Sequence, residues 1–304
     1  MDHFADRLIV RIRELGHPLC VGLDPHLDRI PPLFRQGSMA PADPRTATAV
    51  GAFLDAVLDR VHGRVAVVKP QIAFFERLGW RGLRILGEIV KRARDGGLSV
   101  LLDAKRGDIG STAAGYAEAY LGPEAMLPVD AMTVNPYLGA DTLEPFYQQL
   151  RLHGRGLFVL VKTSNPGSGD FQDRVLAEGG SLCDAVAAAL AATADDLRGP
   201  LTGWSALGVV AGATYPGDGE RIRRLLPHSL FLVPGYGAQG GDAQAAVRGF
   251  VAGPGGCLEG GIVNSSRGIL FPAAAQTDDR RRWDRSIDEA LDRAIAELST
   301  ATTR

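Results

Sequence analysis

The chain alternates short apolar runs with longer segments in which apolar residues recur every three or four positions. Several runs are continuous in Val, Ile and Leu, as expected for strands that are buried on both faces of a parallel sheet. This alternation is typical of a parallel α/β protein. The eight runs span residues 18–23, 65–69, 98–103, 130–134, 156–161, 206–212, 229–235 and 260–265.

Eight strand–helix units predict a TIM (β/α)8 barrel, formed by residues 1–304 as a single domain. The competing architecture is a doubly wound open sheet. In that fold a glycine-rich phosphate-binding turn follows an early strand, whereas the glycine-rich turn here, PGYGAQGG, follows the seventh run. The position of this turn favours the barrel.

Helical spacing extends the prediction beyond the strands. Residues 178–198 and 284–298 carry apolar side chains at i, i+3 and i+4, which fits an outer ring of helices. The charged, amphipathic N-terminus predicts a helix over 2–15. We also expect an extended Pro-rich insertion at about 31–45 and a polar tail at 299–304.

Composition narrows the range of partners. With 45% hydrophobic and 22% charged residues and a net charge of −2, the chain is an ordinary globular protein with no basic excess for nucleic acid. We therefore expect a small-molecule partner, no nucleic acid and no membrane. Cys20, Cys183 and Cys257 lack metal-ligand spacing, so no metal site is predicted, and the chain fits a reducing cytoplasm.

The segment 101–112, LLDAKRGDIGST, concentrates charge at the end of a predicted strand. Side chains at i and i+2 of a regular strand share a face, so Asp103 and Lys105 should project together, with Asp108 just beyond them. Two carboxylates beside an ammonium would keep the lysine protonated and ready to act as an acid. The alternative is a surface cluster of ion pairs.

Two earlier predicted strands also end with a charged residue. These are Asp24 in GLDP and Lys69 in VVKP. Active sites of TIM barrels lie at the carboxyl ends of the strands. The sequence therefore predicts an alternating Lys/Asp array at one mouth of the barrel, although either residue could instead belong to a buried structural pair.

Later strands supply a candidate phosphate site. Loops after the seventh and eighth strands often bind phosphate in such barrels, and here they contain PGYGAQGG at 234–241 and Arg267. Glycine-rich backbone, the Gln239 amide and a guanidinium all suit an anion. The fifth strand ends in Ser164 of SNPG, whose hydroxyl could reach a heterocycle or simply form a turn.

The chain resembles the orotidine 5′-phosphate decarboxylase family, because it carries six motifs of that family in the right order. They are GLDP, VVKP, the DxKxxD core at 103–108, SNPG, PGYGAQGG and Arg267. The chain looks like a member of the longer bacterial branch of this family, because of its length, its insertion and the sequence DAKRGDIGST. The resemblance implies decarboxylation of orotidine 5′-monophosphate to UMP and CO2 in pyrimidine biosynthesis, without cofactor or metal.

The resemblance also implies roles for the charged residues. Lys105 would protonate C6 of the pyrimidine as CO2 leaves, and Asp103 would lie against the substrate carboxylate. Asp24 and Lys69 would bind ribose hydroxyls and hold the charge array. Loss of CO2 leaves a carbanion without an adjacent electron sink, and a fixed ammonium is a group that can stabilise and protonate it.

The remaining roles concern binding and assembly. By analogy with the family, Asp108 and Thr112 would reach into the site of a neighbouring subunit, so we expect a homodimer. Ser164 would contact the pyrimidine edge. The phosphate would be bound by Gln239, Gly240 and Arg267.

Two alternatives remain open from the sequence. Related enzymes that act on sugar phosphates through a magnesium-bound enediolate share the DxKxxD core, but they need a metal-binding carboxylate where this chain has Lys69, and a cation there would repel magnesium. A non-catalytic barrel that senses a pyrimidine nucleotide is the other alternative. An intact DxKxxD core argues against it.

Overall fold

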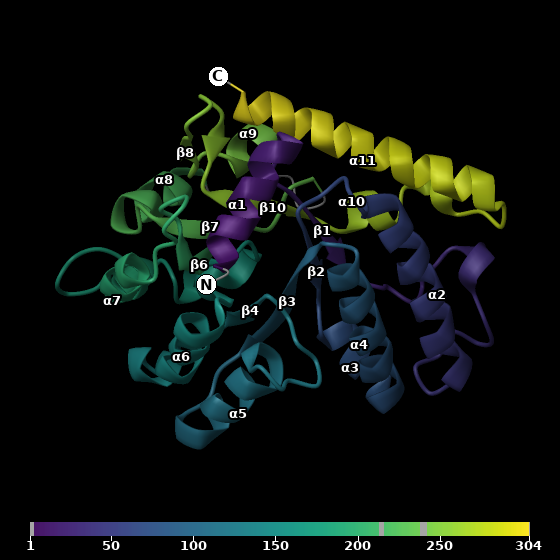
Figure 1. Ribbon diagram of the computed structural model, residues 1–304, viewed down its shortest axis with the longest axis horizontal. Coiled ribbons are helices and arrows are strands. Elements are labelled where there is room, and N and C mark those ends of the chain that lie inside the picture. The colour runs from purple at the N-terminus through teal and green to yellow at the C-terminus, as the bar shows by residue number, and fades with distance from the viewer. Residues whose placement is uncertain (1–2, 213–215, 238–241, 304) are drawn as a thin grey trace.

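The computed structural model describes residues 3–212, 216–237 and 242–303. Eight parallel strands close into a barrel, in the order β1-β10-β7-β6-β5-β4-β3-β2, and helices surround it (Figure 1). The predicted TIM barrel is confirmed, and each predicted apolar run overlaps one barrel strand. The strands are β1 (Leu19–Leu23), β2 (Val67–Pro70), β3 (Ser99–Arg106), β4 (Ala131–Val134), β5 (Gly156–Lys162), β6 (Ser205–Ala211), β7 (Ser229–Val233) and β10 (Gly261–Ser265).

Helices follow the strands because their apolar faces pack on the outside of the barrel. Of the described helices, none is both long and apolar enough to cross a membrane. The helices are α1 (Phe4–Leu15), α2 (Pro44–Val61), α3 (Ala73–Glu76), α4 (Gly79–Asp95), α5 (Gly110–Leu121), α6 (Glu144–His153), α7 (Leu182–Asp196), α8 (Pro216–Leu225), α9 (Ala243–Ala246), α10 (Arg267–Leu270) and α11 (Arg280–Thr302).

Helix α1 packs against the amino-terminal end of the barrel. Its first residue, Phe4, is fully buried and meets Phe158 of β5 edge to face, with ring centroids 6.2 Å apart. Gly156 makes this approach possible, because a Cβ there would collide with the Phe4 ring. Apolar side chains thus fill this end of the barrel, and the polar residues at the strand ends face the opposite mouth.

A short antiparallel hairpin was not predicted. It pairs β8 (Val251–Ala252) with β9 (Leu258–Glu259) between β7 and β10. Strands of two residues are too short for apolar and polar positions to alternate visibly, so the sequence pattern carries no signal for them.

The expected polar tail at 299–304 is instead largely helical, since α11 continues through Thr302. Ala301 and Thr302 are buried, and the Thr302 hydroxyl donates to the Leu298 carbonyl at 2.9 Å. Small side chains and a hydroxyl that bonds back to its own helix allow the helix to continue where composition indicated a tail.

The Pro-rich insertion at 31–45 is anchored to the barrel. It contains a 3-10 turn at Pro32–Phe34, and the Phe34 ring meets Phe53 of α2 and Trp283 of α11 at centroid distances of 5.5 and 4.9 Å. The segment ends where Asp43 caps α2 by accepting from the Arg45 N–H. Aromatic packing therefore holds the insertion against two helices.

Candidate active site

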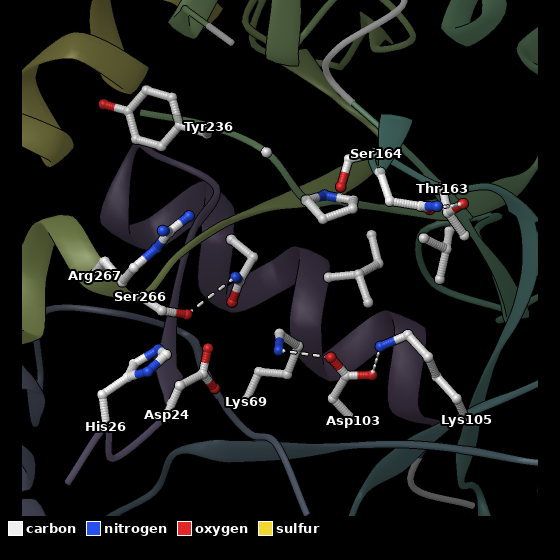
Figure 2. Close-up of a pocket in the computed structure, with 16 residues that line it drawn as sticks. Asp24, His26, Lys69, Asp103, Lys105, Thr163, Ser164, Tyr236, Ser266 and Arg267 are labelled. Atoms are coloured by element: carbon white, nitrogen blue, oxygen red, sulfur yellow. Dashed lines mark hydrogen bonds and ion pairs between the residues drawn. The ribbon is translucent and has the colours of Figure 1, made fainter. Parts of the chain in front are cut away.

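A cavity of about 410 Å³ lies at the carboxyl ends of the strands (Figure 2). Parallel strands bring their carboxyl ends to one mouth, which is why residues distant in sequence meet there. Six of the predicted site residues line it: Asp24, Lys69, Asp103, Lys105, Ser164 and Arg267.

The floor of the cavity is a chain of three charges. The Lys69 ammonium donates to Asp103 Oδ2 at 2.9 Å, and the Lys105 ammonium donates to Asp103 Oδ1 at 2.5 Å. The two lysines differ in exposure, because the Lys69 side chain is 5% exposed and that of Lys105 is 42% exposed. Lys69 is therefore a buried counter-charge, whereas Lys105 reaches into the open part of the cavity.

The charges of this array are strongly coupled. Burial alone raises the pKa of Asp103, but the Lys69 and Lys105 ammoniums outweigh it and hold that pKa well below its usual range. Burial lowers the pKa of Lys69, but the Asp103 and Asp24 carboxylates outweigh it and raise the pKa above its usual range. Asp103 and Lys69 thus remain ionised at neutral pH.

The arrangement around Lys105 differs from the one expected. We expected two carboxylates to flank this lysine, but one carboxylate, Asp103, lies between two ammoniums. Asp108 Oδ1 instead accepts the Ile109 backbone N–H at 2.8 Å. Beyond β3 the chain turns into α5, and within the described residues the lining of the cavity includes neither Asp108 nor Thr112.

Strand β3 also departs from regular geometry at Lys105. Its φ is +48°, a left-handed conformation that costs a lysine about 1–3 kcal/mol. Pairing with β4 shifts here, because Leu102 is opposite Met132 but Arg106 is opposite Val134. Lys105 therefore meets Asp103 through a bulge, and the expected regular alternation is wrong at this point.

A buried threonine of β4 occupies the bulge. The backbone N–H groups of Ala104 and Lys105 both donate to Thr133 Oγ1, at 3.0 and 2.9 Å. The Thr133 hydroxyl in turn donates to Asp103 Oδ1 at 3.0 Å. Sequence reasoning missed this residue, although a threonine inside an otherwise apolar strand is a visible signal.

The wall formed by β1 and β10 carries Asp24 just beyond β1, and Asp24 Oδ1 is buried and has no hydrogen-bond partner among the described residues. A carboxylate oxygen without a partner on a cavity wall is suited to accept a hydrogen bond from a hydroxyl group of a ligand. Gly22 gives this wall room, because a Cβ there would collide with Ser266 Oγ. Asn264 lies beside it and donates to Ser266 Oγ at 3.4 Å.

Arg267, His26 and Tyr236 gather at the end of the cavity away from Lys105 (Figure 2). The His26 ring packs against Phe74 at a centroid distance of 4.6 Å, and burial lowers its pKa. A guanidinium at this end is suited to bind an anion, and the phosphate position stays a prediction. The other predicted phosphate residues, Gln239 and Gly240, lie outside the described residues.

Several lining residues were not singled out from the sequence, although they lie within or beside predicted motifs. His26 follows GLDP directly, and Thr163 and Asn165 flank Ser164. The Gln172 side chain organises that loop, since its Oε1 accepts the Thr163 N–H at 2.9 Å. The polar and aromatic lining residues that were given no role of their own are His26, Thr163, Asn165, Tyr236, Asn264 and Ser266.

A parallel barrel with an ionised pocket at its carboxyl mouth is the architecture of a TIM-barrel enzyme. Residues 17–277 match the orotidine 5′-phosphate decarboxylase / HUMPS family, and the chain belongs to that family. It is 44% identical over 275 residues to the orotidine 5′-phosphate decarboxylase of Rhodopirellula baltica, covering 89% of each chain.

Two further relatives agree with this assignment. The orotidine 5′-phosphate decarboxylase of Haloarcula marismortui is 44% identical over 283 residues, which cover 91% of each chain. The solved structure of Leishmania donovani OMP decarboxylase superposes with a TM-score of 0.74 at 32% identity, covering 99% of both chains.

Proposed function

We propose that this protein decarboxylates orotidine 5′-monophosphate to UMP and CO2, with Lys105 as the proton donor. The relatives from Rhodopirellula baltica and Haloarcula marismortui are named for this activity, and the chain matches each of them over most of its length. The observation that carries the mechanism is the array in which Asp103 is held between a buried Lys69 and a more exposed Lys105.

The chemistry follows from this array. The bond from C6 to the carboxylate breaks, its electron pair stays on C6, and CO2 leaves. The Lys105 ammonium stabilises the developing carbanion and transfers a proton from Nζ to C6. Asp103, kept ionised by Lys69, orients Lys105 and lies against the substrate carboxylate, so that charge repulsion is relieved as CO2 departs.

The rest of the cavity provides binding energy. Asp24 and Lys69 bind ribose hydroxyls, and Ser164 contacts the pyrimidine edge. Arg267, together with Gln239 and Gly240, binds the phosphate at the opposite end. Binding remote from C6 fixes the substrate against the charge array, which lowers the barrier to the chemical step.

We further propose that the protein acts as a homodimer in the cytoplasm, with Asp108 and Thr112 completing the site of the neighbouring subunit. Both lie outside the cavity of their own chain. Ile109, next to Asp108, and Tyr137 and Leu138, just after β4, are exposed hydrophobic side chains, which suits a contact with a second copy. Mixed dimers test this proposal.

Subunits with Lys105→Ala and subunits with Asp108→Ala should each be inactive alone. A mixed dimer would contain one site in which both residues are present, so co-refolding the two variants should recover activity. If the mixture stays as inactive as its components while size measurements show mixed dimers, Asp108 does not act across an interface.

The activity itself is tested with EDTA-treated protein and orotidine 5′-monophosphate, by following the loss of ultraviolet absorbance and identifying UMP. Lys105→Ala should lower turnover about 1,000-fold or more while UMP binding persists. Turnover that requires magnesium would instead favour the sugar-phosphate relatives, and UMP binding without turnover by the unmodified protein would favour a nucleotide sensor.

A further inference from the structure

Thr133 is placed to control the geometry of Lys105 without touching a ligand. It is fully buried in β4, and in the structure it does not line the described cavity. Its hydroxyl oxygen nevertheless makes three hydrogen bonds, and all three go to the segment 103–105. The bonding of this side chain is therefore directed at the charge array.

The two N–H donors are successive along the chain, which is unusual for a strand. Successive N–H groups of a regular strand point to opposite sides within the sheet. Those of Ala104 and Lys105 converge on one oxygen because Lys105 has a φ of +48°. Consecutive N–H groups that form such a concavity bind an electron-rich atom, and here Thr133 Oγ1 is that atom.

The hydroxyl also connects the bulge with Asp103. Since both Ala104 and Lys105 N–H groups donate to Oγ1, its own proton is available for Asp103 Oδ1 at 3.0 Å. The same Oδ1 accepts from the Lys105 ammonium. One side chain thus fixes the backbone of Lys105 and the carboxylate on which its ammonium rests.

We propose that Thr133 is a positioning residue for proton transfer, an inference that rests on the proposed role of Lys105. Without the hydroxyl, two buried N–H groups lose their acceptor, and the left-handed conformation of Lys105 loses the contact that maintains it. The backbone then relaxes and the ammonium moves away from C6. A misplacement of about 1 Å is enough to slow a reaction about 100-fold.

The test compares Thr133→Val, which keeps the shape and removes the hydroxyl, with Thr133→Ser, which keeps the hydroxyl. Thr133→Val should lower kcat about 10- to 100-fold, while KM and the Kd for UMP change less than about threefold. Thr133→Ser should stay within about threefold of the unmodified enzyme in all three constants.

A matched control is Thr46→Val. Thr46 is also fully buried and donates to the Ala40 carbonyl at 2.7 Å, but it lies in α2 away from the cavity. Its replacement should leave kcat unchanged. Thr133→Ala, which is smaller, serves as the second hydroxyl-free variant if Thr133→Val does not fold, and it should show the same selective loss of kcat.

The proposal is overturned if a folded hydroxyl-free variant retains the kcat of the unmodified enzyme, or if Thr133→Ser loses as much kcat as Thr133→Val. It is also overturned if kcat and UMP binding fall together. Lys105→Ala separates these results from the main proposal, because activity in that variant would refute the role of Lys105 itself, whatever Thr133 does.

Discussion

Lys69 and Lys105 share one carboxylate, and their different burial predicts that replacing each with methionine has different effects on stability. Lys69→Met breaks a buried ion pair, which typically destabilises a protein by 3–5 kcal/mol. We expect about 3 kcal/mol, the lower end of that range, because Lys105 and Thr133 still bond to Asp103 Oδ1. That loss corresponds to a decrease in Tm of about 5 °C.

Lys105→Met removes a side chain that is 42% exposed, where an ion pair contributes less than about 1 kcal/mol. Its Tm should fall by less than about 2 °C, because Lys69 still neutralises Asp103. Both variants should lose turnover, since Lys105 donates the proton and Lys69 maintains the charge of Asp103.

Thermal unfolding without ligand and turnover of orotidine 5′-monophosphate are the two measurements. The reasoning is refuted if Lys105→Met lowers the Tm as much as Lys69→Met does. That result would mean that the exposed lysine compensates the charge of Asp103 as much as the buried one does. A Lys69→Met enzyme with full turnover would refute the coupling of the two lysines through this carboxylate.

Three further predictions concern other parts of the molecule. Arg267→Ala should weaken UMP binding about 10- to 100-fold, since a charge-assisted hydrogen bond contributes roughly 1.5–3 kcal/mol, and it should slow turnover; unchanged binding in a titration would place the phosphate elsewhere. The buried Arg223 side chain donates hydrogen bonds to the backbone carbonyls of five residues. Arg223→Met should therefore lower the free energy of unfolding, measured in urea, by about 3 kcal/mol or more. A loss below about 1 kcal/mol would contradict this prediction. Buried His17 accepts the Leu19 N–H at Nδ1 and pairs with the Arg64 carbonyl through Nε2, and burial lowers its pKa from about 6.5. The stability that His17 contributes is therefore present above pH 6.5 and lost as the pH falls through its lowered pKa; the Tm of His17→Gln should change less between pH 7.5 and 5 than that of the unmodified protein, and equal changes would refute the argument.

The barrel could be predicted because its strands carry a strong and repeated signal. Strands buried on both faces must be apolar throughout, and the helices between them must bury one face, so the alternation is imposed by packing. The hairpin of β8 and β9 lacks such a constraint because its strands have two residues each. The continuation of α11 to Thr302 also depends on tertiary packing, which composition does not reveal.

Part of the cavity lining was predictable for a related reason. Parallel strands bring their carboxyl ends together, so Asp24, Lys69 and Lys105 could be assigned to one cavity before their positions were known. The pairing within the cavity could not be derived in this way. Whether a carboxylate bonds to a lysine on its own strand or on the next one depends on register, burial and the path of the chain beyond the strand.

The bulge at Lys105 illustrates this limit and also suggests how it can be reduced. The two-residue period of a strand predicts that Asp103 and Lys105 share a face, and their side chains do meet, but through a left-handed residue. Such a conformation needs an acceptor for the N–H groups that it redirects, and the neighbouring strand AMTV offers one hydroxyl, that of Thr133. A lone polar residue in a fully buried strand has to find a partner. When the adjacent strand carries the charges of the site, that partner is expected among them, as the bonds of Thr133 to Lys105 and Asp103 show.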